Sequence, residues 1–113
     1  MSLDVYLEPP KCSHCGLGKE EIGFNITHNL GPMAKEAGIY QEVWRPGEVC
    51  IAKAEQMIEP LRKGIAEMKA DPERFKALDS SNGWGTYADF LPWLEEYLAA
   101  CEANPDADLS VSR

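Results

Sequence analysis

The chain has 113 residues, of which 44% are hydrophobic and 27% charged, and its formal net charge at pH 7 is −8. This length and composition favour one folded domain over two domains or a disordered chain. The excess of 19 acidic over 11 basic residues disfavours binding to duplex nucleic acid or to an anionic membrane, because both require a basic surface. No apolar run reaches the roughly 18 residues of a membrane span, and the first residues lack the pattern of a signal peptide, so we expect a cytoplasmic protein.

Two segments near the start alternate apolar and polar residues, which is typical of half-buried strands. The first covers residues 3–8 and the second residues 22–27. Residues 11–21, which lie between them, are rich in glycine, cysteine and charge and are predicted to form a loop. In the second strand, Asn25 and Thr27 should project together on the side away from the core.

Helical periodicity dominates the middle of the chain. The predicted helical segments span residues 30–37, 39–44, 51–68, 72–78 and about 86–101. The segment 51–68 has the clearest amphipathic pattern, and it should pack on the core. We expect Pro60 to kink or break it near Glu59, because proline removes an internal hydrogen bond at a cost of about 3 kcal/mol.

Two helix starts stay open at this stage. The first helix could be capped by Thr27, Asn29 or Gly31, and the last could begin at Thr86 or Asp89. Residues 108–111 alternate again and should return as a strand beside the first one. The chain is therefore predicted to be a single α+β domain over residues 1–113. Its short antiparallel or mixed sheet of about three strands would pack against three to five helices.

A polar cluster occurs where the second strand gives way to the first helix. It comprises Asn25, Thr27, His28 and Asn29. Such side chains beside the amides of a helix N-terminus are the usual components of a pocket for a polar or phosphorylated ligand. The alternative is that His28 is a capping or buried structural histidine.

Aromatic residues accompany this cluster in two other stretches. Trp44-Arg45 and the pair Trp84 and Tyr87 carry flat side chains that stack well on a base or a ring. The alternative is that both tryptophans anchor their turns to the core.

Two of the four cysteines form a possible half of a metal site. Cys12 and Cys15 have two residues between them, and Cys15 is followed by glycine, as in a zinc knuckle. One knuckle supplies only two ligands, so the others would have to come from His28, Cys50, Cys101 or His14. The alternative is that Cys12 and Cys15 are free thiols in a loop.

Several motifs together carry a family resemblance. They are Met1–Leu7, Asn25–Leu30, Met33-Ala34, Ala37–Tyr40, Trp44–Pro46, Asn82–Tyr87, Tyr97–Cys101 and Val111–Arg113. In these motifs the chain resembles a family of small phage and prophage proteins of unassigned function. The resemblance implies a common fold and supplies no established activity. Its phage context suggests an antagonist of host defence, which captures a nucleotide signal or binds a host protein.

We interpret the sequence as a small phage-type binding protein for a polar, phosphorylated or nucleotide-like ligand. The predicted ligand-binding residues are Asn25, Thr27, His28, Asn29, Trp44, Arg45, Trp84 and Tyr87. Recognition is favoured over catalysis because the cluster provides no carboxylate partner for His28. One alternative is a metal-dependent hydrolase or nuclease that uses His28 with carboxylates or with the Cys12/Cys15 pair. Another is an interaction module that binds a host protein through the tryptophan-bearing turns.

Overall fold

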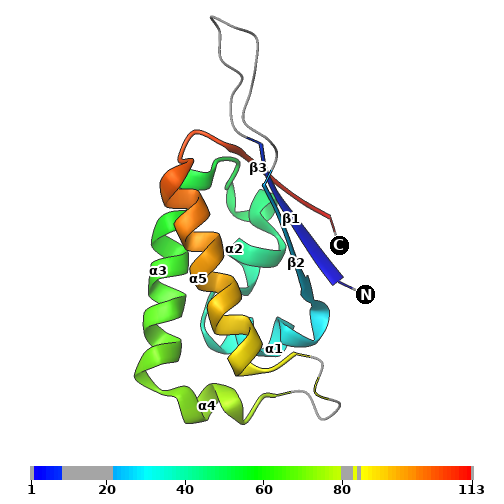
Figure 1. Cartoon of the computed structure of the whole chain (residues 1–113), viewed down its shortest axis with the longest axis vertical. Coiled ribbons are helices and arrows are strands. Elements are labelled where there is room, and N and C mark those ends of the chain that lie inside the picture. The colour runs from blue at the N-terminus through cyan, green and yellow to red at the C-terminus, as the bar shows by residue number, and fades with distance from the viewer. Residues whose placement is uncertain (1, 9–21, 80–82, 84, 113) are drawn as a thin grey trace, which may run out of the picture.

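The computed structural model describes residues 2–8, 22–79, 83 and 85–112. Within these residues, three antiparallel strands form one sheet in the order β2-β1-β3 (Figure 1). The strands are β1 (Ser2–Glu8), β2 (Ile22–Thr27) and β3 (Asp108–Ser112). The predicted α+β class is confirmed, and so is the return of the last strand beside the first.

Alternation along the strands separates the two faces of the sheet. In the middle of β1, Val5 pairs with Phe24 on one side and Val111 on the other, and these apolar side chains face the helices. The polar residues between them point to the opposite side, because successive side chains of a strand alternate. We call that side the outer face of the sheet. It comprises Asp4, Tyr6, Glu8, Gly23, Asn25, Asp108, Ser110 and Ser112.

Helices cover the inner face of the sheet (Figure 1). The described helices are η1 (His28–Leu30), α1 (Gly31–Glu36), α2 (Tyr40–Trp44), η2 (Pro46–Val49), α3 (Ala54–Ala70), α4 (Pro72–Lys76) and α5 (Tyr87–Ala103). The two long helices, α3 and α5, run side by side. The core lies between the helices and the sheet, and its largest fully buried side chains include Trp44, Tyr97, Phe75 and Phe90.

Of the kink or break expected near Glu59, the break is wrong. α3 begins at Ala54, after Ile51, and continues through Pro60 to Ala70. Proline at this position removes the hydrogen bond to the carbonyl of residue 56, at a cost of about 3 kcal/mol. Met57, Leu61 and Met68 of the same helix are fully buried. Burying each such side chain contributes about 1.5–3 kcal/mol, so packing of this face outweighs the missing bond.

The start of α5, which the sequence left open, is at Thr86. Its hydroxyl oxygen accepts a hydrogen bond from the backbone N–H of Asp89, and Pro92 lies inside the helix. Among the helices that the structure describes, none is both long enough and apolar enough to cross a membrane.

Candidate functional site

The polar cluster forms a tight corner between β2 and η1. Thr27 caps η1, because its Oγ1 accepts from the backbone N–H of Asn29 at 3.3 Å. None of the three predicted candidates caps α1, whose N-cap position is Leu30 and has no side-chain cap hydrogen bond. The indole Nε1–H of Trp44 donates to Nδ1 of His28 at 2.9 Å. An indole N–H can only donate, so Nδ1 is an acceptor and the imidazole carries its proton on Nε2. The hydrogen bond therefore joins two of the predicted stretches and sets the tautomer of His28.

A glycine from a third stretch closes the corner from the other side. Gly85 has φ +112, and a Cβ placed on it would lie 3.0 Å from Cγ2 of Thr27, 3.1 Å from Cβ of Asn29 and 3.2 Å from Cγ of Leu30. Only a residue without a side chain fits so close to η1 in this conformation. We call Thr27, His28, Asn29, Trp44 and Gly85 together the His28 corner.

The remaining predicted ligand-binding residues that the structure describes lie in other surroundings. Asn25 is on the outer face, where its Nδ2 donates to Oδ1 of Asp4 at 2.6 Å. Tyr87 is buried at the start of α5, and its hydroxyl donates to the carbonyl of Met68 at 3.2 Å. Arg45 faces a cleft beside β3, which is described next. Trp84, Cys12 and Cys15 lie outside the described residues.

The cleft results from a fourth strand position that is only partly filled. Lys53 forms an antiparallel bridge with Asp108, and the N–H of Leu109 donates to the carbonyl of Ala52 at 2.9 Å. The chain then departs from β3, because the backbone of Cys50 adopts a left-handed conformation (φ 60, ψ 33). The N–H of Ile51 donates to the carbonyl of Pro46 at 2.9 Å and not to β3. The outer edge of β3 beyond Leu109 is therefore left without a neighbouring strand from the described part of the chain.

The edge beyond Leu109 presents backbone groups to the cleft. Backbone groups alternate sides along an antiparallel strand, so the N–H and C=O of Val111 point away from β1, as those of Leu109 do. Among the described residues, no backbone group outside the sheet bonds to Val111. Within the described ranges, the N–H and C=O of Val111 are therefore without a backbone partner at this edge.

The cleft beside this edge encloses about 340 Å³. We call it the β3 cleft, and its lining consists of Trp44, Arg45, Pro46, Gly47, Glu48, Ile51, Ala52, Leu109, Ser110 and Val111. Val49, at the end of η2, is 40% exposed and is the one large hydrophobic side chain that is exposed within the described residues. An apolar floor beside an unpaired strand edge is a combination that natural proteins usually cover or block with charge.

The basic side chains near the β3 cleft are already paired. Arg45 contacts Glu48 at 2.9 Å, and this hydrogen bond, with a smaller contribution from Tyr40, raises the pKa of the guanidinium above its ordinary value. Lys53 forms an ion pair with Asp108, which raises the pKa of the lysine. Both basic side chains near the cleft are therefore paired with an acidic side chain, and the floor of the cleft offers apolar contacts.

The cysteines and acidic residues of the described chain do not form a metal site. No group of three or more His, Cys, Asp or Glu side chains among the described residues is placed to hold an ion. Cys50 is exposed, whereas Cys101 is buried in the core, and burial, with a smaller effect of Glu102, raises the pKa of Cys101 to about 12. The predicted zinc site at Cys12 and Cys15 stays a prediction.

The β3 cleft was missed at the level of sequence, although one signal was present. Residues 109–112 of β3 carry no charge, and edge strands usually carry a blocking lysine or proline. No protein-family model, curated protein or solved structure matches the chain. The functional interpretation therefore rests on the geometry of the cleft and the corner.

Proposed function

We propose that the protein is an interaction module that binds an extended segment of another protein as a fourth strand along β3. The observation that carries this proposal is the open edge at Val111 beside the apolar β3 cleft. An extended peptide offers the N–H and C=O groups that the edge lacks, and its alternate side chains can enter the cleft. This is the recognition mode known as strand addition.

The size of the site sets the expected affinity. The open edge covers residues 110–112, so few main-chain hydrogen bonds can form, each contributing about 0.5–1.5 kcal/mol net. One or two side chains buried against Trp44, Pro46 and Ile51 would contribute about 1.5–3 kcal/mol each. Association costs at least about 4 kcal/mol, so the net binding free energy is at most about 5 kcal/mol and we expect dissociation constants of about 0.2 mM or weaker.

The family resemblance suggests the nature of the partner. If the chain acts as small phage proteins do, the bound segment belongs to a host protein, and binding would antagonise a host defence. This part of the proposal rests on the resemblance alone, whereas the mode of binding rests on the cleft.

The experiment is selection of peptides from a random display library on the wild-type protein, followed by N-methyl scanning of one selected peptide. Methyl groups on alternate backbone nitrogens should abolish binding, and those on the intervening nitrogens should not, because only every second N–H of an added strand faces β3. On the protein side, Val111→Pro removes the outward N–H and should abolish binding. Equal tolerance of methylation at every position would show that the peptide does not bind as a strand.

The His28 corner supports a second candidate function, the recognition of a small polar or phosphorylated ligand. The observation in its favour is that Trp44 holds His28 with Nε2–H as a donor of fixed direction beside Asn29. A ligand at 100 times its dissociation constant should stabilise the fold by about 2.7 kcal/mol. Thermal unfolding with a panel of nucleotides and phosphorylated metabolites tests this. The candidate fails if no compound stabilises the wild type more than His28→Ala.

A further inference from the structure

We propose that the segment bound at β3 alternates apolar and basic residues, with the apolar side chains in the β3 cleft and the basic ones over the outer face of the sheet. This inference rests on the proposed strand addition and names the chemistry of the partner. It follows from the different character of the two faces that an added strand would extend.

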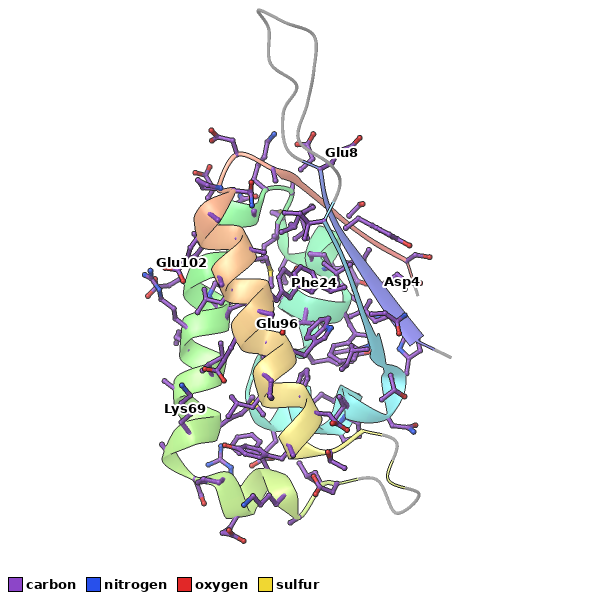
Figure 2. The ribbon with its side chains drawn as sticks, viewed as in Figure 1. Asp4, Glu8, Phe24, Lys69, Glu96 and Glu102 are labelled. Atoms are coloured by element: carbon purple, nitrogen blue, oxygen red, sulfur yellow. The ribbon has the colours of Figure 1, made fainter. Side chains whose placement is uncertain are left out.

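The outer face is acidic. Its charged residues are Asp4 and Glu8 of β1 and Asp108 of β3, and the described strands contain no lysine or arginine. Figure 2 labels Asp4 and Glu8 on β1, whereas Phe24 of β2 points toward α5. Lys53 pairs with Asp108, so the negative charge that is left without an ion pair among the described residues belongs to Asp4 and Glu8.

Asp4 is within reach of a long basic side chain from the edge. Ser112 of β3 is its direct partner in the register. An added strand would lie two strand spacings, about 9–10 Å, from β1, and the small side chain of Ser112 leaves the space between them open. An arginine or lysine could lie across this serine and bring its charge to Asp4, whose carboxylate Asn25 holds in place at 2.6 Å.

The opposite side chains of the added strand meet an apolar surface. They would lie on the same side as Leu109 and Val111, where the β3 cleft is floored by Trp44, Pro46 and Ile51. Arg45 and Lys53 are paired with Glu48 and Asp108 and therefore do not repel a basic partner strongly. Because side chains of a strand alternate between the two faces, the partner segment should read apolar, basic, apolar, basic.

The same charges disfavour a second copy of this chain as the occupant. Each copy has a formal net charge of −8, and pairing β3 with β3 would extend one acidic outer face with another. Like charges on neighbouring strands are unfavourable, and a basic segment removes that repulsion.

Three synthetic peptides test the inference. They share the same apolar residues and carry lysine, serine or glutamate at the alternating positions. We expect the lysine peptide to bind about tenfold more tightly than the glutamate peptide at low salt. The difference should shrink at about 1 M salt, where the Debye length falls to about 3 Å.

Two charge-neutralising variants locate the effect. Asp4→Asn should weaken binding of the lysine peptide about two- to fivefold, as expected for an exposed ion pair. Glu96→Gln removes the same charge from the exposed surface of α5 and should leave the affinity unchanged. If both variants have the same effect, the outer face does not select the partner.

The outcomes separate this inference from the proposed function. If the peptides bind with equal affinity, or the glutamate peptide binds best, the basic specificity is wrong and strand addition stands. If none of the three binds and N-methyl scanning of selected peptides shows no alternation, strand addition itself fails. If the free protein dimerises through β3 in sedimentation experiments, the occupant is a second copy and the inference is overturned.

Discussion

Gly85→Ala tests the contact that closes the His28 corner. A Cβ at position 85 would lie 3.0–3.2 Å from side-chain atoms of Thr27, Asn29 and Leu30, and the residue has φ +112. Over-packing of this kind costs about 1–3 kcal/mol. Holding an alanine at positive φ costs about a further 1–2 kcal/mol. We therefore expect Gly85→Ala to lower the free energy of unfolding by about 2–5 kcal/mol.

Gly38→Ala is the matched control. Gly38 has φ +77, and a Cβ there would meet nothing within 4 Å, so this variant carries the backbone cost of about 1–2 kcal/mol without the steric one. Urea unfolding followed by tryptophan fluorescence measures both free energies. The difference between the two variants reports the contact of Gly85 with η1 together with the extra backbone cost of φ +112 relative to φ +77. Equal destabilisation would refute the packing of residue 85 against Thr27 and Asn29.

Three further predictions concern the core. Burial raises the pKa of Cys101 from 9.0 to about 12. The free energy of unfolding should therefore be unaffected by this thiol below pH 9 and should fall by about 1.4 kcal/mol per pH unit as the pH rises toward 12. Cys101→Ala should flatten this part of the curve of stability against pH, and an unchanged slope would contradict the assignment. For the same reason iodoacetamide at neutral pH should modify Cys50 readily and Cys101 only after unfolding, as mass spectrometry of the digested protein can show. A Cβ on Gly64 would lie 2.7 Å from Cδ1 and Cγ2 of Ile39, so Gly64→Ala should destabilise the protein by about 1–3 kcal/mol, although alanine gains about 1 kcal/mol in helix propensity. Ile39→Val in the same chain should recover part of the loss, and a net gain in stability from Gly64→Ala alone would show that α3 is not packed tightly at this point.

The fold was largely predictable because its strongest signals are periodic. Alternation at residues 3–8, 22–27 and 108–111 predicted the strands, and it also predicted that the last would return beside the first. The error at Pro60 arose because a local rule was applied without the packing that outweighs it. Burial of Met57 and Leu61 is a property of the folded chain, which one residue's propensity does not contain.

The candidate site was less predictable, for reasons that are local. The polar cluster at residues 25–29 was visible, but the hydrogen bond from Trp44 to His28 joins positions 16 residues apart. The β3 cleft exists because Cys50 adopts a left-handed conformation, and cysteine, unlike glycine or asparagine, gives no sequence signal for it. The absence of charge in residues 109–112 was the one readable indication that this edge carries no blocking charge.

Amide hydrogen exchange along β3 tests the central claim most directly. In the free protein we expect the amides of Leu109 and Ser110 to be protected. The N–H of Leu109 donates to the carbonyl of Ala52, and the N–H of Ser110 faces β1. The amide of Val111 should exchange rapidly and become protected when a selected peptide is added. Protection of Val111 in the free protein, or a peptide that leaves its exchange unchanged, would contradict strand addition at this edge.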